Sequence, residues 1–172
     1  MARRFFPFTL FASFALFASA LAERSAYAEP NLIEHPGDHP NYRVELEPHA
    51  NAGYGLLDSG YVGAGFRASI KILDPGPVKT INDTFAITFG GDIFSAKNGK
   101  PFFWIPVGVQ WNFFFTQSWS AFGEAGMVIG VPEKTRLNPV VAVGGRFHMS
   151  ERLALTLRIG YPAISFGLSI FL

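Results

Sequence analysis

The C-terminal stretch Arg152–Leu172, RLALTLRIGYPAISFGLSIFL, decides the fold. Its apolar side chains recur at every second position on both sides of Tyr161-Pro162, and the positions between them carry small or charged residues, apart from Phe171. Successive side chains of a β-strand point to opposite faces, so a period of two predicts strands rather than helices. We therefore predict two antiparallel strands joined at Tyr161-Pro162, each with one apolar face.

The composition is apolar without long apolar runs. Only 16% of the 172 residues are charged, and Phe (19) and Gly (18) are abundant. Beyond the N-terminal region no run reaches the roughly 18 to 20 apolar residues of a transmembrane helix. Apolar residues spread over alternate positions are typical of transmembrane β-strands. The chain has no Cys, which excludes disulfides, and its net charge of +1 offers no excess to attract nucleic acid.

Residues 1–28 have the pattern of a secretory signal peptide for Sec-type export. Two arginines precede the apolar stretch Phe5–Leu21, and Ala20-Leu21-Ala22 and Ala26-Tyr27-Ala28 both fit the small-x-small rule for cleavage. We expect cleavage after the last alanine of one of these motifs. The open alternative is an uncleaved N-terminal anchor.

Residues 29–41, EPNLIEHPGDHPN, are polar, rich in Pro and without periodicity. We therefore predict a flexible lead-in. His35 and His39 flank Gly37-Asp38, but a metal site would need two further ligands on a rigid frame. We interpret both as solvated histidines and expect no metal or other cofactor.

Six further segments alternate apolar with small or polar residues and are separated by turn signals. They are approximately Arg43–Gly53, Tyr61–Ile72, Thr84–Ile93, Phe102–Phe115, Trp119–Gly130 and Val140–His148. Most have about 9 to 12 residues, which matches a tilted membrane-spanning strand. With the final hairpin they make eight strands, and an even number brings both chain ends to the same side. We predict that residues 42–172 form one all-β domain, an eight-stranded antiparallel up-and-down transmembrane barrel.

Aromatic residues gather at the strand ends, as in the interfacial girdles of membrane barrels. Trp111 and Trp119 flank a short turn, and Phe102 and Trp104 begin the strand after the Lys97–Lys100 loop. The whole pattern resembles the small eight-stranded outer-membrane β-barrel proteins of Gram-negative bacteria.

The resemblance covers residues 42–172, although the final residue is Leu172 where that family usually has Phe. It implies a place in the cell outer membrane and insertion by the barrel-assembly machinery. It implies no particular activity, since the family includes membrane stabilisers, adhesins and lipid-modifying enzymes.

Charged residues occupy the phase of the strands that should face inward. They are Arg67, Asp92, Glu124, Arg146 and Arg158. An eight-stranded barrel has an interior just wide enough to be filled by side chains, and buried charges there need partners. We interpret these residues as a structural network in the lumen. Hairpin symmetry places Glu45 and Glu47 near Arg67, and it places Glu124 opposite Gln110 on one side and near Arg146 or Gly144 on the other. The alternative is an ion or proton path.

His148-Met149-Ser150 resembles the His-x-Ser element of outer-membrane lipid A deacylases, where Ser is the nucleophile and His the base. Those enzymes carry Asn-Ala after the Ser and an acid further downstream. Here Glu151-Arg152 follow, and the downstream positions Leu157–Tyr161 have no acid. We therefore predict no catalytic residues and interpret these residues as a polar turn.

The sequence thus predicts an outer-membrane barrel with a structural or unassigned binding role. We expect a monomer that contacts outer-membrane lipid and is not a large-pore porin. One alternative is a soluble periplasmic lipocalin-like barrel that binds an apolar ligand, in which the apolar phase would face inward. A second alternative is a lipid-modifying enzyme of the lipid A deacylase type.

Overall fold

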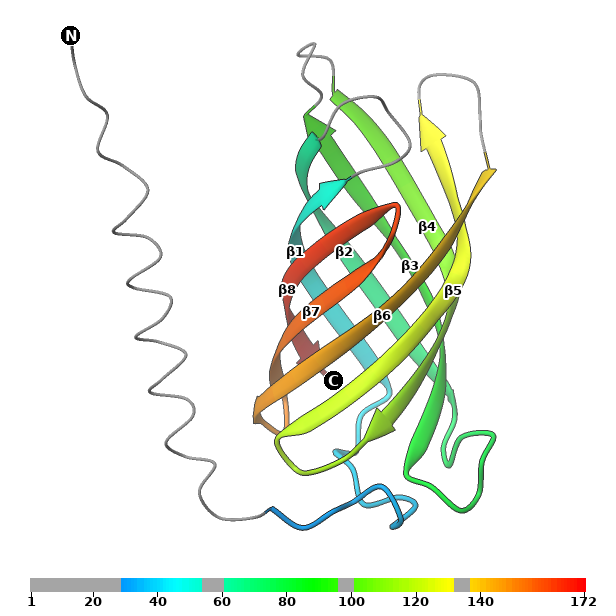
Figure 1. Cartoon of the computed structure of the whole chain (residues 1–172), viewed down its shortest axis with the longest axis vertical. Coiled ribbons are helices and arrows are strands. Elements are labelled where there is room, and N and C mark those ends of the chain that lie inside the picture. Colours follow the sequence, from blue (N-terminus) through cyan, green and yellow to red (C-terminus); the bar gives the residue numbers. More distant parts are fainter. Residues whose placement is uncertain (1–28, 54–60, 96–100, 132–136) are drawn as a thin grey trace, which may run out of the picture. The chain divides into compact units, whose positions relative to one another are not determined.

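Eight antiparallel strands follow one another around a closed barrel (Figure 1). Each strand pairs with its neighbours in sequence, and β8 returns to pair with β1. The strands are β1 Val44–Gly53, β2 Tyr61–Leu73, β3 Asp83–Ser95, β4 Pro101–Phe114, β5 Trp119–Val131, β6 Leu137–Ser150, β7 Leu153–Tyr161 and β8 Ala163–Phe171. The predicted all-β, eight-stranded up-and-down barrel is confirmed, and each predicted segment overlaps one strand.

This computed structural model describes residues 29–53, 61–95, 101–131 and 137–172, and the barrel unit is Asn31–Leu172. The predicted signal peptide, residues 1–28, lies outside the described residues. No helix in the described part of the chain is long and apolar enough to cross a membrane.

The period of two separates an outer from an inner face. Large apolar side chains point outward, such as Val62 (65% exposed), Val143 (66%) and Phe166 (49%). The inward positions hold polar and charged side chains, among them Glu45 and Arg146, both almost completely buried. A soluble barrel around an apolar ligand would have the opposite orientation.

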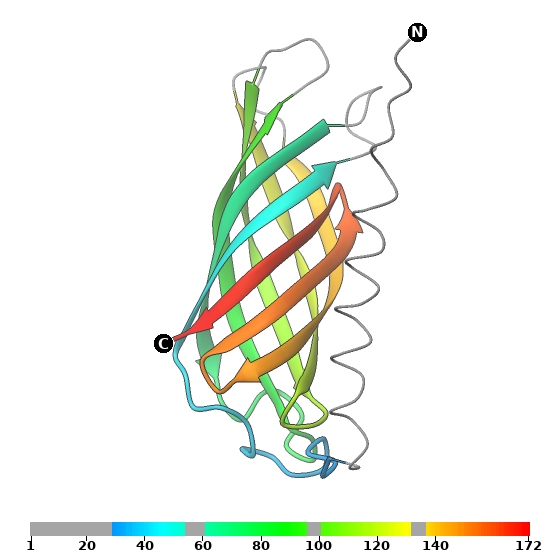
Figure 2. The ribbon, with the colours of Figure 1, turned by 90° about the vertical axis from the view of Figure 1, so that its left-hand side faces the viewer.

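The two ends of the barrel differ in their connections. The blue segment before β1 and the C-terminus lie toward the same end, which also holds the β2–β3, β4–β5 and β6–β7 connections (Figures 1 and 2). We call this the turn end. The opposite end, where β1–β2, β3–β4, β5–β6 and β7–β8 are connected, is called the loop end.

Residues 31–41, for which the sequence predicts a flexible lead-in, instead pack against the turn end. The amide of Leu32 donates to the carbonyl of Phe115 at 2.7 Å, and the amide of Asn82 donates to the carbonyl of Ile33 at 2.6 Å. The flexibility of residues 29–41 stays a prediction, but local periodicity gave no sign of these long-range backbone hydrogen bonds.

His39 is part of this packing and is not the solvated histidine expected from sequence. Its side chain is 2% exposed and stacks on Phe114 with ring centroids 4.6 Å apart. Its Nδ1 lies 2.6 Å from Asn82 Oδ1 and its Nε2 lies 3.2 Å from Asp74 Oδ2. His35 is exposed, and no group of three or more metal-binding side chains occurs among the residues that the structure describes.

Charge interactions add to the packing at the turn end. Lys71 donates to Asp74 Oδ2, and its Nζ lies 4.7 Å from the centre of the Tyr42 ring. Burial alone would raise the pKa of Asp74, but hydrogen bonds and charge from Lys71 and His39 outweigh burial and lower it. An ionised Asp74 therefore adds to the backbone and aromatic contacts that hold this segment.

Candidate functional site

The barrel interior holds all five charged residues that the sequence assigns to the lumen. Their exposed fractions are 6% for Arg67, 6% for Asp92, 4% for Glu124, 1% for Arg146 and 3% for Arg158. Glu45 and Glu47 of β1 join them at 2% and 1%. Three guanidinium groups thus share the interior with four carboxylates, and we call these seven residues the lumen network.

Glu45 and Arg146 form a bidentate pair across the interior. Arg146 Nε donates to Glu45 Oε1 at 2.9 Å, and Nη2 donates to Oε2 at 2.7 Å. Arg146 Nη1 also donates to Asn112 Oδ1 at 3.0 Å, and Ser169 Oγ donates to Glu45 Oε1 at 2.6 Å. The β1–β2 register confirms the expected position of these acids near Arg67, with Glu47 directly opposite Arg67 and Glu45 opposite Ser69. The ion pair of Glu45 is nevertheless with Arg146, because a long guanidinium side chain reaches β1 from β6.

Arg158 holds two carboxylates at once. Its Nη1 and Nη2 donate to the two carboxylate oxygens of Glu47, each at 2.8 Å, and its Nε lies 3.0 Å from Glu124 Oε2. Glu47 thus lies opposite Arg67 in the β1–β2 register, as expected, but its ion pair is with Arg158. Glu124 faces Gln110 in the β4–β5 register, as expected, but its cation is Arg158 rather than Arg146.

An aromatic ring supports two of the guanidinium groups from inside the barrel. The Phe122 ring centre lies 4.2 Å from Arg146 Cζ and 5.0 Å from Arg158 Cζ, within the range of cation–π interactions. Gly144 makes room for this ring, since a Cβ at that position would lie 2.1 Å from it. At the neighbouring Gly145 a Cβ would meet nothing within 4 Å.

Arg67 is the most weakly paired guanidinium of the lumen network. Its Nη1 lies 3.9 Å from Asp92 Oδ2 and its Nε lies 3.8 Å from Glu124 Oε1, and both separations are too long for hydrogen bonds. Both nitrogens are buried without a hydrogen-bond partner. Asp92 instead accepts hydrogen bonds from His49 Nε2 at 2.8 Å and from Asn51 Nδ2 at 3.1 Å. Two buried donors of Arg67 therefore have no hydrogen-bond partner among the described residues.

A cavity of about 30 Å³ adjoins these unpaired donors. Its polar lining includes His49, Asn51, Arg67, Asp92, Arg158 and Ser165. Its apolar lining includes Trp104, Pro106, Val128, Val140 and Ala142, together with Tyr161, Pro162 and Ala163 at the β7–β8 turn. His49 and Asn51 were not predicted as site residues, although they continue the inward phase of Glu45 and Glu47.

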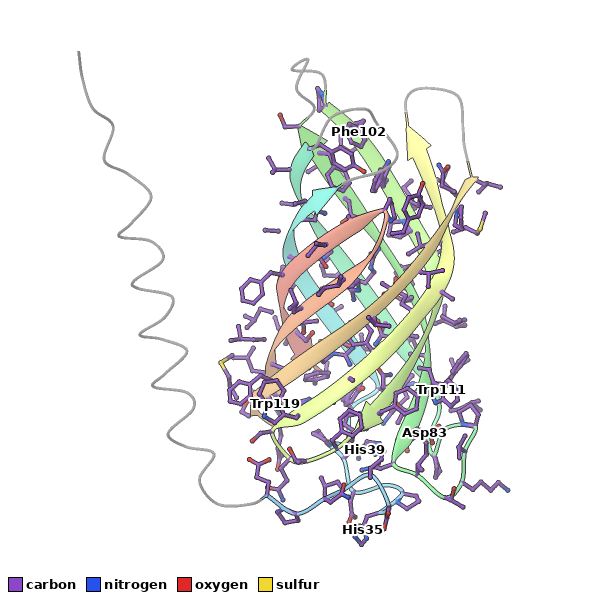
Figure 3. The ribbon with its side chains drawn as sticks, in the orientation of Figure 1. His35, His39, Asp83, Phe102, Trp111 and Trp119 are labelled. Atoms are coloured by element: carbon purple, nitrogen blue, oxygen red, sulfur yellow. The ribbon has the colours of Figure 1, made fainter. Side chains whose placement is uncertain are left out.

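Aromatic side chains fill the interior toward the loop end. Phe94 and Trp104 lie 4.5 Å apart between ring centroids, and Tyr61 lies 4.8 Å from Phe94. Val128 and Val140 complete this buried cluster, and Phe102, which Figure 3 shows near the loop end, packs against it.

A second cluster fills the turn end and explains why Phe171 departs from the apolar phase of its strand. Phe171 points inward and is 2% exposed. Its ring lies 4.6 Å from the ring of Tyr42 and 5.3 Å from the ring of His148, and Phe114 and Ala154 belong to the same cluster. Burial raises the pKa of Tyr42, which precedes β1.

The His148 side chain contacts Ser120 rather than Ser150. His148 Nε2 lies 2.8 Å from Ser120 Oγ, and His148 Nδ1 is buried without a partner, so no carboxylate orients the ring. Ser150 is exposed, and its Oγ accepts a hydrogen bond from the amide of Arg152 at 3.3 Å. The geometry of a Ser-His-acid triad is not formed by these residues.

Comparison with known proteins places the fold among transmembrane β-barrels. A de novo designed transmembrane β-barrel superposes with a TM-score of 0.51 at 14% identity, covering 80% of this chain and 99% of that chain. The solution NMR structure of the designed barrel TMB2.3 gives 0.51 at 16% identity, covering 79% and 98%. The Yersinia pestis outer membrane protein Ail in a phospholipid nanodisc gives 0.48 at 10% identity, covering 77% and 100%. No protein-family model and no curated protein matches the chain.

Proposed function

We propose that this protein is an outer-membrane β-barrel of Gram-negative type, exported by the Sec route, with a structural or ligand-binding role. The observation that carries the proposal is the orientation of the two strand faces. Apolar side chains such as Val143 and Phe166 cover the outer wall, while the lumen network lies inside. In water an outer wall of this kind would be an exposed apolar patch around the whole barrel, whereas in lipid it is the favoured surface.

Aromatic side chains at both ends of the outer wall support this placement. Trp119 (50% exposed) and Phe115 lie at the turn end, and Phe103 and Tyr161 lie toward the loop end. Trp111, also near the turn end, donates its indole N–H to Asp83 Oδ2 at 2.7 Å (Figure 3). Rings with one apolar and one polar edge suit the boundary between hydrocarbon and headgroups.

A filled interior supports a role other than large-pore transport. The lumen network, the aromatic cluster around Phe94 and the cluster around Phe171 occupy successive levels of the barrel. We further propose that the protein is a monomer that contacts outer-membrane lipid, is inserted by the barrel-assembly machinery and binds no nucleic acid. We also propose that it is not an enzyme, because His148 bonds Ser120 and lacks an orienting acid.

Cell fractionation tests the location. We expect the mature protein in the outer-membrane fraction, resistant to a high-salt wash, and faster on a gel before boiling than after it. Recovery of the folded protein in the soluble periplasmic fraction would overturn the proposal. Lipid A acyl-chain analysis of cells that express wild type or Ser150→Ala tests the absence of enzyme activity. Loss of an acyl chain that requires Ser150 would contradict it.

A further inference from the structure

At the loop end, the barrel wall extends least far at the β7–β8 turn. β7 and β8 have 9 residues each, whereas β6 has 14. The pairing of β6 with β7 begins at Val141–Tyr161, so the first residues of β6, Leu137–Val140, extend beyond β7. Figure 2 shows the turn between the orange β7 and the red β8 below the loop ends of the longer strands. We call this place the step.

The cavity beside Arg67 reaches the wall at the step. The turn residues Tyr161, Pro162 and Ala163 line the cavity together with Val140 of β6. Arg67 of β2 lines it too, with its Nε and Nη1 buried and unpartnered. A small polar group that crosses the step would therefore meet two guanidinium donors that have ion-pair contacts but no hydrogen-bond partner.

The size and chemistry of the cavity favour a carboxylate. A volume of about 30 Å³ accommodates roughly two water-sized atoms, which equals the two oxygens of a carboxylate but not the four oxygens of a phosphate group. The planar fork of Arg67 matches carboxylate geometry. Of the flanking acids, Asp92 accepts hydrogen bonds from His49 and Asn51. Glu124 Oε2 forms an ion pair at 3.0 Å with the Nε of an arginine on β7, although that contact is not a hydrogen bond.

The surroundings of the step favour an alkyl chain on that carboxylate. Apolar residues around the step point outward, and Val141 (61% exposed), Ile159 (49%) and Ile164 (39%) belong to the three strands that meet there. A ligand with its head in the cavity would leave its chain on this apolar wall.

We propose that the cavity binds the carboxylate of a single-chain fatty acid, which enters over the step and hydrogen-bonds to Arg67. This inference rests on the proposed membrane location, since the outer wall then offers the alkyl chain a lipid environment. The inference names fatty acids as the ligand class for the proposed ligand-binding role of the barrel.

Trp104 lines the cavity and provides the readout. The chain has three Trp residues, so Trp111→Phe/Trp119→Phe leaves Trp104 as the single fluorophore. The folded protein in detergent micelles is titrated with 2-bromododecanoate, whose bromine lies next to the carboxylate, and with 2-bromododecan-1-ol as the matched probe without charge. We expect the acid to quench Trp104 saturably. Its half-saturation concentration should be at least tenfold lower than that of the alcohol.

Two variants separate the site from partition into micelles. Arg67→Met should raise the concentration of acid needed for half-maximal quenching at least tenfold. The concentration of alcohol needed for half-maximal quenching should not change. Ala163 is not one of the lumen network residues; it lines the cavity and packs against the cluster around Trp104. Ala163→Phe narrows the step and should also raise the concentration of acid needed for half-saturation. Arg152→Met, an exposed arginine at the β6–β7 turn, is the control and should behave as wild type. Heat-modifiable mobility verifies that each variant is folded.

Equal quenching by acid and alcohol, or unchanged acid binding in folded Arg67→Met, would overturn the ligand assignment. Unchanged acid binding in folded Ala163→Phe would overturn entry over the step. The titration uses purified folded protein, so its failure leaves the proposed membrane location standing. Recovery in the periplasmic fraction would overturn the location whatever the titration gives.

Discussion

The Arg146→Met substitution tests whether the lumen network holds the barrel together. Met keeps most of the aliphatic volume of Arg146 but removes the two donors that bind Glu45 at 2.9 and 2.7 Å. Glu45 is 2% exposed and would then keep only the hydroxyl of Ser169 at 2.6 Å and the amide of Gln110 at 3.4 Å. A buried carboxylate would therefore lose its cation.

Removal of one partner of a buried ion pair costs about 3–5 kcal/mol. Since two neutral donors stay on Glu45, we expect a loss near the lower limit, about 3–4 kcal/mol. With a urea m-value of about 2 kcal/mol per M, the unfolding midpoint should fall by about 1.5–2 M. Urea titration in lipid vesicles, followed by Trp fluorescence, measures this shift.

The double variant Glu45→Gln/Arg146→Met distinguishes the loss of the ion pair from destabilisation that each substitution causes by itself. Because neither charge is then left alone, its loss should be smaller than the sum of the two single losses by about 2–3 kcal/mol. Arg152→Met at the exposed turn should stay within about 0.5 kcal/mol of wild type. Additive single losses, or an Arg146→Met protein within about 1 kcal/mol of wild type, would refute the role assigned to the network.

Three further expectations follow from the geometry. Gly144→Ala should destabilise the barrel by about 1–3 kcal/mol in the same urea assay, because its Cβ would overlap the ring under the guanidinium groups, whereas Gly145→Ala should be neutral. Val143→Arg on the outer wall should cost about 2–4 kcal/mol in vesicles if that position lies at mid-bilayer, and a loss below about 1 kcal/mol would place it near the membrane surface. Asp74 has a folded-state pKa below 3.8, so its contacts stabilise fully above 3.8 and are lost as the pH falls through the folded value. The difference in urea midpoint between wild type and Asp74→Asn should therefore shrink between pH 7 and pH 3, and a constant difference would contradict the assigned contacts.

Local periodicity was sufficient to predict the strands and the inner face. Alternation depends only on neighbouring residues, so the inward phase of Glu124 and Arg158 follows once the strand is recognised. Short turns also fix the register within a hairpin, which is why Gln110 was correctly expected opposite Glu124.

Contacts across the lumen could not be predicted in the same way. Which side chains meet there depends on the stagger of the strands around the closed barrel and on the reach of each guanidinium group. Arg146 therefore pairs with Glu45, 101 residues earlier in the chain, rather than with a neighbour in its own hairpin. The packing of residues 31–41 escaped prediction for a similar reason, since the Asn82 amide that binds Ile33 belongs to the distant β2–β3 connection.

At the closing seam between β1 and β8, the lumen network supports the barrel wall where backbone pairing is interrupted. Pairing runs from Glu45 and Leu46, pauses at the next two residues and resumes at His49. Pro48 stands in this gap and has no N–H to donate to a ladder. On the inner side of the same stretch, Glu45 accepts hydrogen bonds from β6 and β8, and Glu47 accepts two from β7. The weakest part of the ladder is thus the part that the network holds from inside, and a proline in β1 is tolerated because closure does not depend on backbone pairing alone.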